Sequence, residues 1–193
     1  ELEEKFVCSH IGFLNQDRNS PVLWEAVGEL GKEIPAFKEK LVLRFIGKTD
    51  PLCLQQLAEQ ELSAHVEQIS YVPHSEVLTY TRATQLLMLL VNDVPNVMGH
   101  IPGKTYEYVG SRRPVLGIGP PKADFARIIS ESKSGTVSGF QDKEGMKRAL
   151  FKMFSQYKKG KLHTEDADID RFTRKHAAGQ IANFMNEMIS EKA

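Results

Sequence analysis

Two charged side chains follow a Pro-Gly pair at a spacing that suits a nucleotide. Lys104 and Glu107 come after Pro102-Gly103 and lie three residues apart, so in a helix they share one face. The first turn of a helix has unpaired N–H groups and the positive end of the helix dipole, and Lys104 adds positive charge there. A carboxylate one turn further on suits ribose hydroxyls. The pattern indicates a phosphate site at Gly103, Lys104 and Thr105, with Glu107 beside it. The alternative is an exposed ion pair worth about 0.2–0.5 kcal/mol.

A second phosphate candidate lies near the amino terminus. Residues 5–11 form a predicted strand that ends at Gly12, and a loop then leads to a helix capped by Ser20 with Pro21 in its first turn. Arg18 lies in that loop, and a guanidinium can pair with a diphosphate through two parallel hydrogen bonds. The alternatives are an exposed loop arginine and a plain turn glycine.

Segments of strand length alternate with helical segments along the chain. Strands are predicted at residues 5–11, 41–46, 66–71, 85–91, 114–118 and 136–140. The apolar run at 85–91 is continuous, as in a parallel strand covered on both faces. The alternation predicts an α/β fold with a doubly wound parallel sheet of about six strands, helices on both faces and a C-terminal helix. We expect a single domain over residues 1–193, with the terminal helix at 165–190.

Caps and glycines set the expected limits of the helices. We expect the first helix to end at Gly31, a helix near residue 75 to be capped by Ser75, and the helix at 122–132 to end just before Gly135. The helix at 104–111 is expected to carry Tyr106, Val109 and Gly110 on one side.

The candidate binding segments are expected to meet at one edge of the sheet. Ligands of doubly wound sheets bind at the carboxyl ends of the strands, near the point where the strand order reverses. That edge would hold Gly12, Gly47, the corner at Val72-Pro73-His74 and the loop at 92–103. The helix that starts near Lys104 begins there too, so independent candidates converge on one crevice.

Three histidines are expected near the same crevice. His10, His74 and His100 follow or end predicted strands, together with Gly99 in the loop. A general base among them is one interpretation, and a loop or capping role is the favoured one. The six histidines show neither HxxxH nor HExxH spacing, so no protein-bound metal is predicted.

The composition excludes several classes of protein. Lys and Arg number 25, as do Asp and Glu, which argues against a general nucleic-acid binder. No apolar run reaches the ~18 residues of a membrane span. Cys8 and Cys53 lack CxxC spacing, which favours thiols in a reducing compartment. The sequence starts at Glu1 without Met, and we interpret it as a piece of a longer protein.

One segment of the sequence resembles the donor site of group 1 glycosyltransferases. It reads Lys104-Thr105-Tyr106-Glu107-Tyr108, then Gly110-Ser111-Arg112-Arg113, then Pro114-Val115-Leu116. These enzymes have two Rossmann-like domains in the GT-B architecture, and the C-terminal domain binds the nucleotide sugar. The resemblance extends more weakly over residues 5–142. Two positions depart from the family pattern: Gly99 stands where many members have a first glutamate, and Leu23 stands where they often have a lysine.

The resemblance implies a role for each candidate residue. Glu107 would hold the ribose, Gly12 and Arg18 would face the diphosphate together with the Lys104 helix, and the backbone at Val72 and Pro73 would read the base. Catalysis would rest on stabilising the departing diphosphate, and no catalytic residue is identified. The nucleotide-diphosphate sugar, with UDP as the expected nucleotide, is a substrate, so no cofactor is expected.

The resemblance also implies a setting for the reaction. The acceptor would be a cell-envelope glycan or lipid of a bacterium, as in polysaccharide biosynthesis, and an N-terminal domain absent from this chain would bind it. This fragment alone would then bind the donor without transferring the sugar. The expected location is cytoplasmic, at the inner face of the membrane if there is peripheral contact.

Other functions stay open at this point. A nucleotide-sugar epimerase of the same fold would need acid/base residues in the crevice, and His10, His74 and His100 are the candidates. A dinucleotide-binding domain is disfavoured because no GxGxxG follows the first strand. A non-catalytic interaction module is the remaining alternative.

Overall fold

Six parallel strands form one sheet in the computed structural model, which describes residues 4–164 and 168–190. In the order β3-β2-β1-β4-β5-β6, the strands are β3 (Val66–Ile69), β2 (Leu41–Ile46), β1 (Phe6–Ile11), β4 (Leu86–Leu90), β5 (Val115–Ile118) and β6 (Gly135–Ser138). Every neighbouring pair is parallel. The order reverses between β1 and β4, so the predicted doubly wound sheet is confirmed, with its switch point beside β1.

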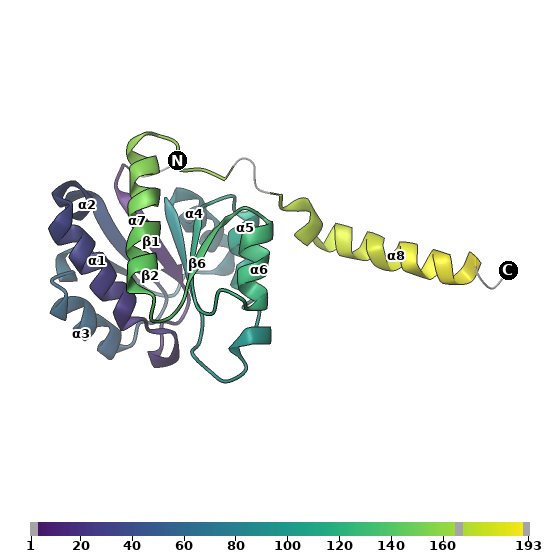
Figure 1. Cartoon of the computed structure of the whole chain (residues 1–193), viewed down its shortest axis with the longest axis horizontal. Helices are drawn as coiled ribbons and strands as arrows, with labels where there is room; N and C mark the ends of the chain where they lie inside the picture. Colours follow the sequence, from purple (N-terminus) through teal and green to yellow (C-terminus); the bar gives the residue numbers. More distant parts are fainter. Residues whose placement is uncertain (1–3, 165–167, 191–193) are drawn as a thin grey trace.

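Helices cover both faces of the sheet (Figure 1). One layer contains α1 (Pro21–Glu33), α2 (Pro35–Lys40), α3 (Pro51–Glu59) and α7 (Lys143–Lys158), and it packs on one hydrophobic cluster. The other contains α4 (His74–Ala83), α5 (Lys104–Gly110) and α6 (Asp124–Glu131) on a second cluster. Alternate side chains of β4 enter the two clusters, which explains why its sequence is apolar without interruption.

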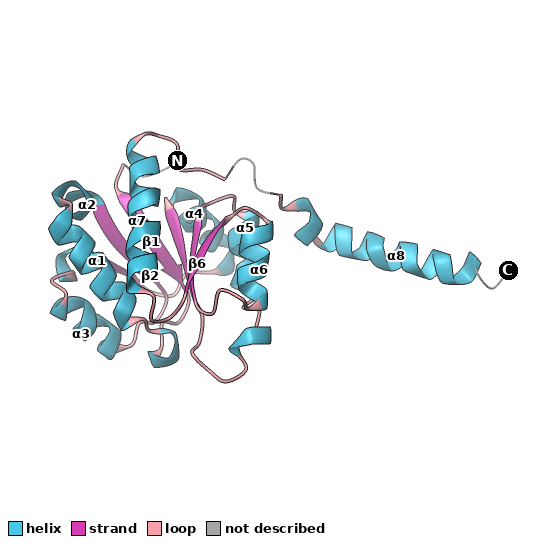
Figure 2. Ribbon diagram, viewed as in Figure 1, coloured by secondary structure: helices cyan, strands magenta, loops and turns pink. Residues whose placement is uncertain are grey.

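Four short 3₁₀ turns complete the described structure: η1 (Gln16–Arg18), η2 (Ser63–His65), η3 (Val97–Gly99) and η4 (Asp170–Phe172). Figure 2 shows the loops that join the helices and the strands.

The first helical segment differs from its prediction. α1 continues through Gly31 to Glu33, and a second helix, α2, follows it directly. Gly31 is buried inside α1, where a Cβ would have atoms of Lys38 at 3.6 Å. The interruption comes at Pro35, because proline cannot donate the hydrogen bond that would continue α1. The prediction that Gly31 ends the helix was therefore wrong.

In α5, Tyr106 is 45% exposed, and the buried residues are Thr105, Tyr108 and Val109. Two other expectations were wrong in detail. Ser75 lies inside α4, which starts at His74 without a side-chain cap. Gly135 opens β6, where a Cβ would collide with the carbonyl oxygen of Val115 at 1.9 Å, so it serves strand pairing and not the end of a helix.

The terminal helix α8 (Arg174–Ser190) extends away from the body of the domain (Figure 1). It buries no residue, and its exposed apolar side chains are Ile181, Phe184, Met185, Met188 and Ile189. The predicted first residues of the helix, 165–167, lie outside the described residues. In the described ranges, no helix combines the length and the apolar character needed to cross a membrane.

Candidate nucleotide-phosphate site

Two glycines with positive φ shape the carboxyl edge of the sheet at its switch point. Gly12 follows β1 with φ +105°, and Gly47 follows β2 with φ +114°, a region that favours glycine. The Gly12 N–H donates to the carbonyl of Ile46 at 2.6 Å, and a Cβ at Gly47 would lie 3.0 Å from the Gly12 backbone. The two loops are thus held against each other, and neither glycine can take a side chain without strain.

The Lys104 side chain reaches from the start of α5 to the loop after β1. A Cβ placed on Gly12 would lie 2.5 Å from Lys104 Nζ and 2.9 Å from its Cε, so the ammonium lies over Gly12. Burial and the nearby charge of Arg18 lower the pKa of Lys104 to about 8, and Glu107 opposes that shift. The sequence placed these residues in two separate motifs, and the fold brings them together.

Arg18 is fixed between the loops that follow β1 and β4. Its Nε donates to Asn92 Oδ1 at 2.7 Å, and its Nη1 donates to the carbonyl of Phe13 at 3.0 Å. The Asp93 N–H donates to the carbonyl of Asp17 at 2.9 Å, which joins the same two loops a second time. A guanidinium held by two hydrogen bonds loses little further freedom when an anion binds.

His10 lies inside β1 with a neutral ring. Its side chain is 1% exposed, and Nδ1 lies 3.2 Å from the carbonyl oxygen of Met88. Burial, followed by the charges of Lys104 and Arg18, lowers the pKa of His10 to about 3. Nε2 is buried and makes no hydrogen bond to any described residue. A ring that stays neutral and buried at pH 7 does not suit the general acid/base role left open by the sequence.

Tyr108 ties α5 to the end of β1, a contact that the sequence did not predict. Its hydroxyl accepts a hydrogen bond from the Ile11 N–H at 3.1 Å, and burial raises the pKa of the phenol. Because Tyr108 is one turn after Lys104, this bond helps to place Lys104 over Gly12. The spacing i, i+4 from Lys104 was the only available signal, and it does not identify the partner.

The start of α5 differs from the expected phosphate cradle. α5 has seven residues, and Gly103 before it has φ −54°, an ordinary value, and a Cβ added to it would meet no atom within 4 Å. Nothing in this geometry requires a glycine. Thr105 is fully buried with an unpartnered Oγ1, and Glu107 is exposed. The positive charge of the site therefore comes from the Lys104 side chain and not from a long helix.

The remaining candidates lie on the rim of the same edge. Val72 and Pro73 connect β3 to α4, and His74 is the exposed first residue of α4 and not a loop residue. Gly99 ends η3 and His100 follows it, both exposed. In the part of the chain that the structure describes, no three His, Cys, Asp or Glu side chains are grouped as a metal site would need.

Comparison with solved structures identifies this architecture. No protein-family model matches the sequence, and no curated protein is detectably similar to it. The crystal structure of the C-terminal domain of the group 1 glycosyltransferase LpcC from Francisella tularensis superposes with a TM-score of 0.63 at 14% identity, over 85% of this chain and 83% of that one. The S. aureus protein TarM, solved with UDP, gives 0.68 at 11% identity, over 96% of this chain and 36% of TarM.

The chain has the fold of a GT-B glycosyltransferase domain. A putative UDP-N-acetylglucosamine 2-epimerase from Listeria monocytogenes shares this fold, with a TM-score of 0.61 at 14% identity, over 97% of this chain and 46% of the epimerase. This GT-B domain thus spans less than half of the TarM and epimerase chains. At these identities the likeness establishes the fold alone, so the chemistry has to be argued from the residues of the site.

Proposed function

We propose that this chain is the nucleotide-sugar donor domain of a glycosyltransferase. The observation that carries the proposal is the position of Lys104 Nζ over Gly12, with Arg18 fixed in the loop that follows Gly12. Two cations beside a loop at the switch point of a doubly wound sheet form a site suited to a diphosphate.

The proposed chemistry is electrostatic. As the bond between the sugar and the diphosphate breaks, negative charge grows on the departing phosphate oxygens. Lys104 and Arg18 would stabilise that charge, and stabilisation that is greater in the transition state than in the bound donor accelerates the reaction. Arg18 is already fixed by Asn92 and the Phe13 carbonyl, so it needs little reorganisation.

The other residues would hold the nucleoside. Glu107 is exposed one turn after Lys104, where its carboxylate can accept from ribose hydroxyls. The backbone at Val72 and Pro73, together with Tyr71, which is 85% exposed, would contact the base. UDP is the proposed nucleotide because TarM was solved with UDP.

The acceptor half of the reaction would lie outside this site. A separate N-terminal domain would bind the acceptor, which we propose to be a cell-envelope glycan or lipid at the cytoplasmic face of a membrane. On this proposal the present chain binds the donor, and it transfers sugar only when that second domain is present.

An epimerase is the second candidate, supported by the shared fold of the Listeria protein. The histidines weigh against it. His10 is buried and neutral, and His74 and His100 are exposed on the rim. With a pKa of about 3, the buried His10 is unsuited to proton transfer at pH 7.

Isothermal titration with UDP, GDP, ADP and NAD tests the proposal. We expect one nucleoside diphosphate to bind, and Lys104→Ala and Arg18→Ala each to weaken its binding by tenfold or more, since charge-assisted hydrogen bonds contribute about 1.5–3 kcal/mol. Lys158→Ala, which removes an exposed lysine of α7, is the matched control and should leave binding unchanged. Binding of NAD alone, or nucleotide binding that neither site variant weakens, would contradict the proposal.

A further inference from the structure

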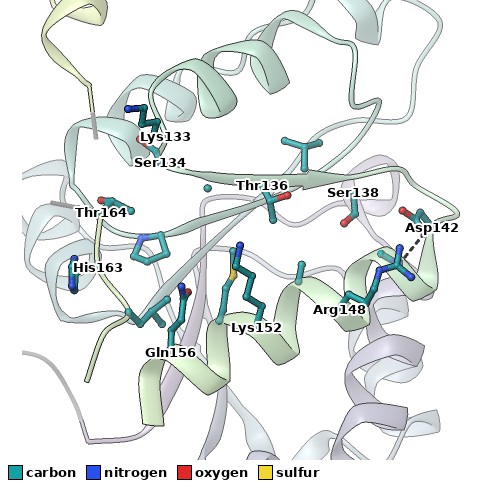
Figure 3. A pocket seen from close by; sticks show the side chains of 17 residues that line it. Lys133, Ser134, Thr136, Ser138, Asp142, Arg148, Lys152, Gln156, His163 and Thr164 are labelled. Carbon is teal, nitrogen blue, oxygen red and sulfur yellow. Dashed lines mark hydrogen bonds between the residues drawn. The ribbon is translucent and has the colours of Figure 1, made fainter. Parts of the chain in front are cut away.

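A groove lies beside β6, away from the proposed phosphate site. It has a volume of about 510 Å³, and it runs between this strand and α7, with residues 162–164 at one end. We call it the β6–α7 groove, defined by Lys133, Thr136, Ser138, Arg148, Lys152 and Gln156. Figure 3 shows these side chains around the open space, with α7 on one side and β6 on the other.

The groove is lined by positive charge that no described residue pairs. Lys133, Arg148 and Lys152 form no ion pair with any residue in the described ranges 4–164 and 168–190. The lining carboxylate, Asp142, is engaged in capping α7, since its Oδ1 accepts from the Gly145 N–H at 2.8 Å. The lysines of α7 that face α1 behave differently: Lys143 and Lys147 both pair with Glu29. Within the described ranges, the charge in the groove is therefore available to a ligand.

The floor of the groove ends in an open strand edge. Among the described strands, β6 pairs with β5 alone. The carbonyls of Ser134 and Ser138 accept hydrogen bonds from β5-side N–H groups at 3.0 Å each. Alternate residues of a parallel strand point their backbone groups to opposite neighbours. The N–H and C=O of Gly135 and Val137 therefore face outward, where a further strand can pair with them.

The spacing of the α7 side chains matches that of an extended peptide. Arg148, Lys152 and Gln156 lie four residues apart on one face of α7, about 6 Å between successive positions. Side chains on one face of an extended chain repeat every two residues, at roughly 6.6 Å. Acidic residues at alternate positions of an added strand would thus reach Arg148 and Lys152 in turn.

We propose that the β6–α7 groove binds an extended acidic segment of a partner protein, which adds to the free edge of β6. Main-chain hydrogen bonds to Gly135 and Val137 supply the pairing, and Arg148 and Lys152 select acidic side chains at alternate positions. The positive lining disfavours basic segments. Binding in the groove is independent of the proposed glycosyltransferase activity, because it uses none of the residues of the phosphate site.

The test uses a fluorescein-labelled peptide in which glutamate alternates with valine and threonine. Fluorescence anisotropy should show binding at low salt, and hydrogen exchange should slow at the amides of residues 135–138 when the peptide is present. We expect Arg148→Glu with Lys152→Glu to weaken binding at least about tenfold, through two lost pairs and two new repulsions. Lys158→Glu with Lys159→Glu makes the same change in net charge on exposed lysines outside the groove, and should retain the affinity apart from a small general effect.

Three results would overturn the proposal. The first is equal binding of a peptide of the same composition whose glutamates stand in one block. Such a peptide cannot place glutamates at alternate positions of an added strand, so equal binding would show that the alternation does not matter. The second is unchanged exchange at residues 135–138 on binding, or unchanged affinity in the Arg148/Lys152 variant with its thermal unfolding intact. The third is binding of inorganic phosphate or of vesicles with anionic lipid that depends on Arg148 and Lys152 while the peptide does not bind; the groove would then be an anion or membrane site.

Discussion

The lowered pKa of Lys104 predicts that nucleotide binding takes up a proton. In the free protein the pKa of Lys104 is about 8, because of burial first and then the charge of Arg18, with Glu107 opposing and the neutral His10 close by. A bound diphosphate favours the ammonium and should return the pKa toward the ordinary value of ~10.4. At pH 9 about nine-tenths of a proton would be taken up per diphosphate bound, and at pH 7 only about one-tenth.

The same linkage fixes the change in affinity. Between pH 7 and pH 9 the free protein loses the charged form of Lys104 while the complex keeps it. The dissociation constant should therefore rise about tenfold, which corresponds to about 1.4 kcal/mol. The terminal phosphate of the nucleotide is mostly ionised throughout this range, so its own titration adds little.

Calorimetric titration in buffers of different ionisation enthalpy measures the proton uptake directly. Lys104→Arg keeps a charge at every pH used, so its affinity should change little between pH 7 and pH 9, and its uptake should vanish. If the wild type binds UDP without proton uptake at pH 9, or if Lys104→Arg keeps the tenfold pH dependence, Lys104 is not the group that meets the phosphate and the reasoning fails.

Three further predictions concern the residues that place Lys104. Gly12→Ala should cost about 1–3 kcal/mol of unfolding free energy in urea, because its φ of +105° strains a side chain, and it should also weaken nucleotide binding because Cβ would displace Lys104 Nζ. Tyr108→Phe should lower the free energy of unfolding by about 1–3 kcal/mol, since it leaves the buried Ile11 N–H without its acceptor. Tyr106→Phe, on the exposed side of α5, is the control. Equal losses of stability in the two variants would contradict the role given to the Tyr108 hydroxyl. Lys104→Met should stabilise the free protein at pH 7 by up to about 3 kcal/mol, because it removes the cost of burying the ammonium. Between about pH 8 and 10.4 the Lys104 side chain is protonated in the unfolded chain but mostly neutral in the folded protein. Wild-type stability should therefore rise with pH over that range, and the stability of the variant should not. A thermal unfolding series from pH 7 to 10 without this difference would count against a buried Lys104.

The sequence was sufficient to predict that Gly12 and Lys104 lie at the same edge of the sheet. Strands alternating with helices imply a parallel sheet, and the carboxyl ends of its strands define one edge, so Gly12 and the start of the Lys104 helix had to be neighbours there. The prediction needed only the order of the elements. It did not depend on where each helix begins or ends.

The contacts inside the site could not be predicted in this way. The reach of Lys104 over Gly12 and the hydrogen bond from Ile11 to Tyr108 depend on the tilt of α5 against β1, which no local pattern encodes. The helix after Gly103 has seven residues, and its phosphate-binding role stays a prediction. His10 was expected in the crevice because it comes near the end of its strand, but its ring is buried beside Met88.

The central position of β1 has a consequence for how this protein folds. β1 pairs with β2, the next strand along the chain, but also with β4, and its last N–H bonds to Tyr108, 97 residues further along the chain. Contacts of such separation carry a high loop-closure cost, and they are typical of slow folding. Because Lys104 reaches Gly12 only after β4 and α5 have joined β1, we expect the proposed nucleotide site to be among the last parts to assemble. The recovery of nucleotide binding during refolding would then report the final step of folding. It can be followed in the same experiment as the recovery of secondary structure, and it should come later.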